Sequence, residues 1–349
     1  MIGHSLLHWD ENLFTVSFSI ISGIWFAFAL HLLMALLLGH FFLIFISLIG
    51  KKINKKMTGI ICFVIAVMFT GYGVINALYP QVKTIEIQLK NLPEAWRNKS
   101  IVHIADMHLG RIQGVGFINR LAIKINKLNP DIIAITGDMF DGIPKNMEEL
   151  NIALSQFRSV HGTYYVLGNH DRRTGAEKLR DILKKSKITI LANEVIVINN
   201  LMIIGITYPG ISDFSEIKLP EKISIETLLD PDIPKLLLFH TPTNIYTKKE
   251  DEKTQRYKSY WQPDTSFTMN KKLGNVLQLS GHTHKGQIFP FNFLTHHRYN
   301  GYDYGLFHEG DFLLYVTNGV GNWGPMLRTF NTPEILLIKL RGNSDTRTN

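Results

Sequence analysis

Five segments of the sequence share one layout, in which a short apolar run is followed at once by polar side chains. The polar segments are Asp106-Met107-His108, Gly137-Asp138, Gly168-Asn169-His170-Asp171, His240 and Gly281-His282-Thr283-His284. Short apolar runs bounded by polar residues are typical of buried strands. Ligands of open α/β sheets bind beyond the carboxyl ends of the strands. We therefore expect these side chains to converge on one site.

The expected site contains two Asp, one Asn and several His side chains. Carboxylate, amide and imidazole groups without a thiolate suit a pair of divalent metals of the borderline class. The pair His282 and His284 alone would be weak evidence, because His-x-His pairs are common by chance. The prediction of a metal site therefore depends on all five segments together.

Taken in order, the five motifs resemble those of the calcineurin-like metallophosphoesterase superfamily. The longer segment Ser280–Gln287 is similar to the form found in the membrane-associated bacterial branch of that superfamily, and the resemblance covers roughly residues 82–340. It implies an α/β (α+β) fold in which two packed β-sheets are flanked by helices, a four-layer αββα sandwich. It also implies hydrolysis of a phosphoester, with attack by a metal-activated hydroxide.

The resemblance further implies a ligand set for two divalent ions, with Asp138 as the bridging carboxylate. The first ion would take Asp106, His108, Asp138 and His284, and the second would take Asp138, Asn169, His240 and His282. Manganese is favoured by the resemblance, and the ligand types leave iron and zinc open. The intact His108 favours diesters over monoesters by the same resemblance.

His170 remains outside this ligand set and is placed to protonate the leaving group. Asp171 could orient that imidazole, the alternative being an exposed loop carboxylate with no such role. Asp141 and Arg111 are weaker candidates for contact with the site, since a turn residue and a solvated residue are the simpler interpretations. Lys285 could narrow or charge the mouth of the pocket.

Two long stretches near the N-terminus lack Asp, Glu, Lys and Arg, namely residues 13–49 and 57–79. About 20 apolar residues suffice for a helix to cross a bilayer, so we expect two N-terminal transmembrane helices. The first stretch is a long tilted helix or breaks near Gly39-His40. The single cysteine, Cys62, lies in the second stretch, so no disulfide framework is expected.

The expected topology is that of a multi-pass protein of the cell membrane. Lys51, Lys52, Lys55 and Lys56 form a short basic loop between the two spans, and such loops face the cytoplasm. Two spans would then place the domain after Pro80 on the exocytoplasmic side. Some members of the similar branch hydrolyse the pyrophosphate of UDP-2,3-diacylglucosamine on the cytoplasmic face, which is the opposite arrangement.

The chain therefore divides into a transmembrane anchor over residues 1–80, a phosphoesterase domain over 81–341 and a disordered tail over 342–349. Hydrophobic periodicity predicts the elements of the domain. The predicted strands are 84–89, 100–105, 131–136, 163–167, 195–198, 201–206, 235–239, 276–279, 312–317 and 334–339, and the predicted helices are 118–128, 147–157, 176–185 and 223–229. Strands and helices alternate in the first half, whereas the hairpin at Asn199-Asn200 indicates antiparallel strands afterwards.

The formal net charge of +8 comes mostly from the residues after 80 and suits anionic lipid surfaces or phosphate-bearing substrates. A tethered enzyme gains most when its substrate is also in the membrane. We therefore expect two partners, the bilayer and a phosphoester substrate that this argument makes lipid-linked, and no nucleic acid. Residues 246–275 form a long segment with many charged and aromatic side chains. The segment is either a flap that contacts substrate or membrane, or a solvated insertion.

Two other classes of function are consistent with parts of the sequence. A non-catalytic metal-binding scaffold is one, but scaffolds of this fold usually lose ligands, and all seven positions are filled here. A nuclease is the other, because the Gly-Asn-His-Asp segment and the basic charge fit it. The N-terminal spans argue against a nuclease, since nothing in them helps to reach a duplex.

Overall fold

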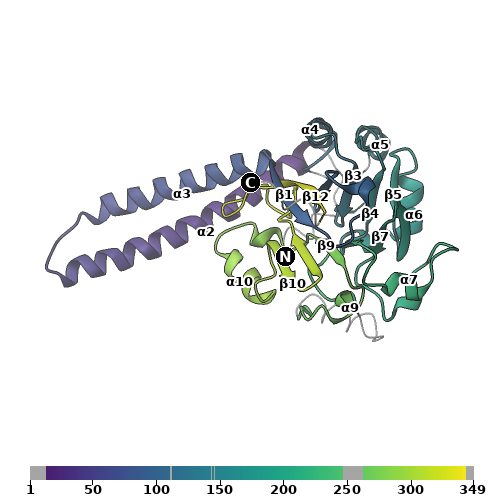
Figure 1. The fold of residues 1–349 in the computed structure, drawn as a ribbon. Coiled ribbons are helices and arrows are strands. Elements are labelled where there is room, and N and C mark those ends of the chain that lie inside the picture. Colours follow the sequence, from purple (N-terminus) through teal and green to yellow (C-terminus); the bar gives the residue numbers. More distant parts are fainter. Residues whose placement is uncertain (1–12, 111, 143, 145, 247–261, 343–349) are drawn as a thin grey trace.

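Two six-stranded β-sheets packed face to face form the domain that follows an N-terminal helical hairpin (Figure 1). The computed structural model describes residues 13–110, 112–142, 144, 146–246 and 262–342. The strand orders are β1-β12-β2-β3-β4-β5 in the first sheet and β10-β11-β9-β8-β7-β6 in the second. Helices cover the outer faces, so the prediction of two packed sheets flanked by helices is confirmed.

The strands of the first sheet are β1 (Gln81–Gln88), β2 (Ser100–Ile104), β3 (Ile132–Thr136), β4 (Thr163–Val166), β5 (Ile188–Ile190) and β12 (Glu334–Arg341). Those of the second are β6 (Glu194–Ile198), β7 (Leu201–Ile206), β8 (Lys235–Phe239), β9 (Val276–Ser280), β10 (Gly305–Glu309) and β11 (Phe312–Val316). The α-helices are α2 (Leu13–Leu48), α3 (Lys55–Leu78), α4 (Val115–Asn126), α5 (Met147–Leu154), α6 (Ala176–Ile182), α7 (Ile225–Leu229), α9 (Thr268–Lys271) and α10 (Phe291–Arg298). Short 3-10 helices occupy η2 (Glu94–Trp96), η3 (Asp171–Arg173), η4 (Phe214–Glu216) and η5 (His284–Gly286).

Both sheets are mixed, and each contains a run of four parallel strands. β2, β3, β4 and β5 pair in parallel in the first sheet, and β7, β8, β9 and β11 do so in the second. After the β6–β7 hairpin, β10 pairs antiparallel with β11 and β12 pairs antiparallel with β2, as predicted. The prediction of antiparallel strands was wrong for β7, β8, β9 and β11. The reason is that long connections follow β7, β8 and β9, and these return the chain to the same end of the sheet each time.

Three apolar layers account for the stability of the domain. Val102, Ile133 and Leu150 belong to the layer that packs α4, α5 and α6 on the first sheet. The layer between the sheets includes Trp96, Ile132 and Leu236, and a third layer covers the outer face of the second sheet. Continuous apolar runs such as those of β3 and β8 are buried on both faces, as strands in this position must be.

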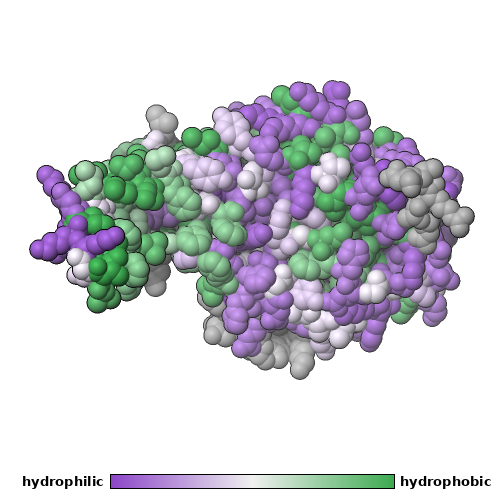
Figure 2. All heavy atoms as spheres, turned by 60° about the vertical axis from the view of Figure 1, so that its left-hand side comes forward, coloured by the Kyte–Doolittle hydropathy of each residue, from purple (hydrophilic) through white to green (hydrophobic). Residues whose placement is uncertain are grey.

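The hairpin of α2 and α3 projects from one end of the domain (Figure 1). Both helices are long and apolar enough to cross a membrane. Their surface is hydrophobic as far as a hydrophilic tip, where the four lysines of residues 51–56 lie, whereas the domain surface is mainly hydrophilic (Figure 2). α2 continues without a break through Gly39 and His40, so the alternative of two short segments does not hold.

Polar contacts within the hairpin fix how its two helices pack. His31 Nδ1 lies 2.8 Å from the Thr70 hydroxyl, and Cys62 Sγ donates to the carbonyl oxygen of Ala35 at 3.2 Å. A Cβ added to Gly39 would lie 2.7 Å from Cys62 Sγ, so the helices approach closely there. Small residues at such contacts are typical of helix pairs in lipid.

Trp96 provides a test of the packing between the sheets. Its side chain is completely buried in the layer between the sheets, and its indole Nε1 donates to the carbonyl oxygen of Ile198 at 2.9 Å. We expect Trp96→Ala to lower the free energy of unfolding by about 3–5 kcal/mol, because it leaves a large cavity. Ile123→Ala, which truncates an exposed side chain of α4, should change it by less than about 0.5 kcal/mol. Thermal unfolding of the full chain in detergent would show the difference, and equal effects would contradict the assigned role of Trp96.

Candidate metal centre

All five polar segments singled out in the sequence lie at one edge of the sandwich, beyond the carboxyl ends of β2, β3, β4, β8 and β9. Backbone hydrogen bonds tie the loops together after the strands end. The Asp106 amide donates to Gly137, the His108 amide to Asp138, and the Gly281 amide to His240. The last of these bonds joins neighbouring loops of the second sheet. The candidate residues are thus held by the backbone as well as by their side chains.

The backbone at this edge is strained in a way that crowds side chains together. Asp106, His108, Asp138, His282 and His284 all have positive φ angles, which are unfavourable for residues with a Cβ atom. Such strain persists only where the surrounding structure imposes it, and it is concentrated at functional sites.

Two glycines permit the close approach of the loops. A Cβ on Gly168 would lie 2.1 Å from Asp138 Oδ1, and one on Gly281 would lie 2.4 Å from Asp106 Oδ2. Neither carboxylate could keep its place beside a larger residue. The motifs Gly-Asn-His-Asp and Gly-His-Thr-His therefore need their first residue for space.

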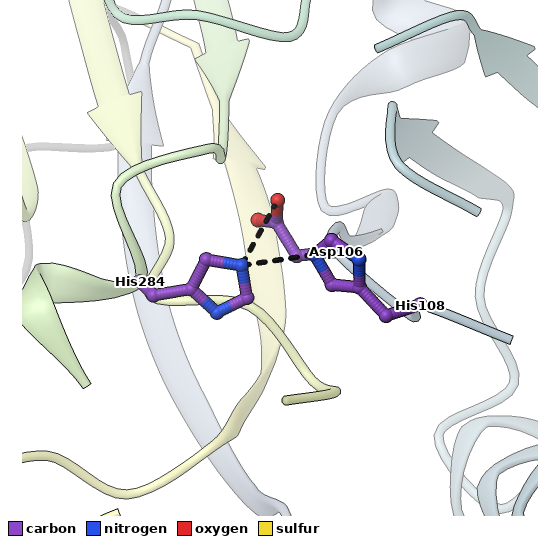
Figure 3. A group of neighbouring side chains, drawn as sticks. All are labelled: Asp106, His108 and His284. Atoms are coloured by element: carbon purple, nitrogen blue, oxygen red, sulfur yellow. Dashed lines mark hydrogen bonds and ion pairs between the residues drawn. The ribbon is translucent and has the colours of Figure 1, made fainter. Parts of the chain in front are cut away.

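The first cluster consists of Asp106, His108 and His284 (Figure 3). His284 Nε2 lies 3.0 Å from His108 Nε2 and 3.6 Å from Asp106 Oδ1. All three side chains are buried. Asp106 comes from the first sheet and His284 from the second, so the cluster exists only because the sheets pack together.

The second cluster consists of Asp138, His240 and His282, with Asn169 beside them. His240 Nε2 lies 3.2 Å from Asp138 Oδ2, 3.0 Å from Asn169 Oδ1 and 3.1 Å from His282 Nδ1. Asp138 Oδ2 also lies 3.9 Å from His108 Nε2 of the first cluster. Asp138 is therefore the carboxylate between the two clusters.

His170 lies at the edge of this arrangement and is held by Asp141. Its Nε2 is 4.0 Å from Asp138 Oδ2, and its Nδ1 is 2.8 Å from Asp141 Oδ1. The same carboxylate oxygen of Asp141 lies 2.7 Å from His108 Nδ1. The sequence interpretation favoured Asp141 as a simple turn residue, but here it orients two imidazoles of the site.

Asp171 has a different environment from the one expected. It is buried, and its carboxylate accepts hydrogen bonds from the backbone amides of Gly168, Met139 and Phe140. It therefore joins the loop after β4 to the loop after β3, while Asp141 takes the position beside His170. The sequence pointed to Asp171 because it follows His170 directly, whereas Asp141 lies beside His170 only after folding.

The charges in the site compensate one another. Burial lowers the pKa of His108 and of His240, but the carboxylates of Asp141 and Asp138, respectively, outweigh it and raise each pKa to about 9. Burial and the charge of His240 lower the pKa of His282 to about 3. Protons on two imidazoles thus balance the buried carboxylates. A divalent cation ligated by the same atoms can replace those protons.

The donor set fits divalent metals on chemical grounds. Two ligands of one ion, each about 2.1 Å from it, lie about 3.0–3.4 Å apart in regular geometry. Most of the donor distances in the two clusters fall in or near that range, between 3.0 and 3.9 Å. Buried carboxylates and imidazoles converging at such distances are the normal composition of a site for transition metals.

Comparison with known proteins agrees with the site. The profile of the calcineurin-like phosphoesterase family matches residues 99–286, which include all five polar segments. The chain belongs to this family. A metallophosphoesterase of Campylobacter jejuni, named as uncharacterized, is 31% identical over 310 residues, which are 85% of this chain and 75% of the relative.

Further relatives extend the likeness to membrane proteins. An uncharacterized metallophosphoesterase of Aquifex aeolicus is 27% identical over 80% of this chain and 99% of its own length. A transmembrane protein with a metallophosphoesterase domain from Danio rerio is 28% identical over 81% of this chain, which spans 62% of that relative. Together with the two apolar helices, the Danio rerio relative indicates that this phosphoesterase is associated with a membrane.

Arg328 is a site residue that the sequence analysis missed. It is fully buried, and its guanidinium donates to the Gly321 carbonyl oxygen, to Asn322 Oδ1 and to Asn331 Oδ1, with His284 Nδ1 at 3.1 Å. Burial, then the charge of His108 and then that of Arg328 lower the pKa of His284 well below the usual value, which favours the neutral ring. No motif marks Arg328, which lies 44 positions from its histidine partner.

The same loop is bonded to the end of the membrane hairpin. The Arg328 amide donates to the Gly73 carbonyl oxygen at 2.9 Å, and Asn76 Nδ2 donates to the carbonyl oxygens of Arg328 and Asn331. Asn331 Nδ2 in turn donates to the His284 carbonyl oxygen at 2.9 Å. α3 is therefore linked to a candidate ligand through one layer of residues.

The remaining sequence candidates have other environments. Lys285 Nζ lies 4.3 Å from the centre of the Tyr304 ring, a cation–π contact at the side of the site. Arg111, residues 247–261 of the expected flap and residues 343–349 of the expected tail lie outside the described residues. His31 contacts Thr70 of the neighbouring helix.

We expect Arg328→Met to destabilise the protein, because three oxygen acceptors would lose a buried donor. An unsatisfied buried acceptor costs about 1–3 kcal/mol, so the melting temperature of the full chain in detergent should fall clearly. Arg120→Met, at an exposed position of α4, is the matched control and should leave it nearly unchanged. If both variants melted like the wild type, the hydrogen bonds of Arg328 would not contribute to stability.

Proposed function

We propose that the protein is a membrane-anchored dinuclear-metal phosphoesterase that hydrolyses phosphodiester or pyrophosphate bonds, with lipid-linked substrates favoured. The observation that carries this proposal is the convergence of six candidate ligands on the two sides of the seventh, the Asp138 carboxylate. Membership of the calcineurin-like phosphoesterase family supports the reaction class. The apolar hairpin supports the membrane location and, through it, the substrate class.

The proposed ligand set assigns each candidate to one of two ions. One ion would be held by Asp106, His108, Asp138 and His284, and the other by Asp138, Asn169, His240 and His282. Asp138 would bridge them, which is consistent with its distances of 3.2 Å to His240 and 3.9 Å to His108. We favour manganese, with iron and zinc equally compatible with these ligand types.

Divalent ions bound there would supply Lewis acidity, lowering the pKa of water and neutralising phosphoryl oxygens. The protein groups contribute positioning and proton transfer. His170 faces the same space as Asp138 and is held through Nδ1 by Asp141. Burial lowers the pKa of His170, but Asp141 and Asp138 raise it overall, which favours the protonated ring that could donate to the leaving oxygen.

The proposed topology divides the chain into an anchor of two spans over residues 1–80, a catalytic domain over 81–341 and a tail over 342–349. The four lysines between the spans favour a cytoplasmic tip. The catalytic domain would then lie on the exocytoplasmic side. Its substrate would be a phosphoester or pyrophosphate in the outer leaflet or beyond.

The activity is tested with full-length protein in detergent, added manganese and bis-p-nitrophenyl phosphate. We expect turnover in the wild type, loss on chelation, and at least 100-fold lower turnover with reduced metal content in Asp138→Ala and His282→Ala, because each removes a proposed ligand. Asp311→Asn and His308→Ala change the same residue types at exposed positions and should retain both properties.

A folded wild-type protein that bound no metal and hydrolysed no generic ester would refute the enzymatic proposal. The scaffold interpretation would then be preferred. The full chain is needed because Gly73 and Asn76 of the hairpin bond the loop that carries Arg328.

His170→Ala separates proton transfer from metal binding. We expect it to lower turnover of an alkyl phosphodiester by about 10²–10⁴-fold, the usual contribution of a general acid, with unchanged metal content. The loss should be smaller with a p-nitrophenyl ester, whose leaving group needs no proton. Asp141→Asn should also lower turnover more with the alkyl ester than with the p-nitrophenyl ester, but by smaller factors. Equal losses on both esters would argue against His170 as the acid.

A further inference from the structure

Five large apolar side chains are exposed on two segments next to the candidate metal centre. They are Phe291, Phe293 and Leu294 of α10, and Trp323 and Phe330 of the loop between β11 and β12, each between 43% and 63% exposed. We call these five residues the apolar rim. Among the described residues after Pro80, every exposed Phe, Leu and Trp side chain belongs to it. Such clustering on an otherwise polar domain indicates a contact surface.

The two segments of the rim are joined to each other. The Phe289 ring packs against Phe293 at 5.8 Å and against Phe330 at 6.4 Å between centroids. Gln287 bonds the backbone of Trp323 through both its amide nitrogen and its amide oxygen. The rim is therefore one surface. Its α10 segment follows η5, the 3-10 helix that begins at His284.

The rim is continuous with the membrane hairpin. Ile288 and Leu327 pack with Ala27, Leu30 and Val74 in one buried apolar cluster. The chain of both rim segments thus packs against the hairpin within a few residues of the exposed side chains. In Figure 1, α10 lies beside the base of the hairpin.

The position of this contact along α3 matches the edge of a bilayer. α3 has 24 residues and is about 36 Å long, whereas the hydrocarbon core is about 30 Å thick. If the lysines at the tip lie in one headgroup layer, the hydrocarbon ends about 20 residues later, close to Gly73 and Asn76. Those are the residues that bond the loop of Arg328. The rim therefore lies at the depth of the opposite headgroup layer.

The charges of the two segments agree with this position. Residues 281–302 and 312–333 contain no Asp or Glu, whereas Lys285 and Arg298 are basic. Aromatic side chains favour the interface between water and hydrocarbon, and basic groups favour anionic headgroups. A protein partner would not require the surface to align with the membrane boundary.

We propose that the apolar rim inserts into the interfacial layer of the bilayer and so places the metal centre at the lipid surface. The consequence for the substrate rests on the proposed function. The substrate is a phosphoester in the headgroup layer of that leaflet, and it reaches the metal centre without leaving the membrane. The loop that carries His282 and His284 leads directly into α10, so insertion of α10 orients that loop toward the headgroups. The hairpin sets the distance of the domain, and the rim sets its tilt.

Site-directed spin labels test the insertion in full-length protein reconstituted in nanodiscs containing phosphatidylglycerol. Cys62→Ala removes the single cysteine, and Phe293→Cys, Leu294→Cys or Phe330→Cys introduces the label. We expect these positions to be more accessible to oxygen than to a water-soluble nickel complex. Val160→Cys is the control, because Val160 is an exposed apolar residue outside the rim, between α5 and β4. Its label should be more accessible to the nickel complex than to oxygen.

Two results would overturn the insertion. Rim labels with the same aqueous accessibility as the Val160 control would mean that the rim stays in water. Spin–spin broadening between rim labels of different molecules, with low access to both reagents, would mean that a second copy of the chain covers the rim.

Kinetics test the consequence separately. The double variant Phe293→Asp with Leu294→Asp should retain turnover of soluble bis-p-nitrophenyl phosphate and lose at least about tenfold in hydrolysis of a phosphoester lipid in vesicles. Equal losses on both substrates would overturn the role in substrate access. If the wild type hydrolysed neither ester while rim labels still lay in lipid, the proposed function would fail and the membrane contact would stand.

Discussion

The contact between Asp138 and His240, 3.2 Å long, joins the two sheets at the point on which the candidate centre depends. Asp138 follows β3 of the first sheet and His240 follows β8 of the second. The apolar layer between the sheets brings these strand ends together, because burying Ile132 and Leu236 against each other fixes the spacing of the edge. Buried carboxylates at this edge are stable only when their charges are compensated, and a divalent cation would provide that compensation.

The strain and crowding of the edge follow from the same constraint. Loops from both sheets must bring several short side chains into a small volume, and the left-handed backbone at Asp106, Asp138 and His282 turns the side chains inward. The cost of order 1–3 kcal/mol for each such residue is offset by hydrogen bonds between the loops. Gly168 and Gly281 lie where any Cβ would displace a carboxylate.

The membrane hairpin is part of the support of the centre. Gly73 and Asn76 bond the loop of Arg328 and Asn331, and those two side chains contact His284. The anchor and the phosphoesterase domain therefore share an interface of directed hydrogen bonds. This arrangement differs from a flexible tether, in which the orientation of the domain would be independent of the helices.

The periodic pattern of apolar residues determined much of the secondary structure, including the two apolar helices, most strands and the strand ends that carry the seven candidate ligands. These features are local, because a buried strand and its terminal polar residues are adjacent in sequence. The pattern did not reveal β5, β10 or α10, which are short or amphipathic in ways that only their neighbours make favourable. It also misjudged the pairing of the second sheet, because pairing direction depends on where long connections lead.

What the sequence by itself determined was the set of chemical groups available and the strand ends that present them. Only the tertiary structure decided which groups meet: Asp141 rather than Asp171 beside His170, Arg328 against His284, and α10 beside the membrane helices. The physical reason is that these contacts join residues from separate loops or sheets. Their distances follow from how the apolar layers pack, and no spacing within the chain encodes them.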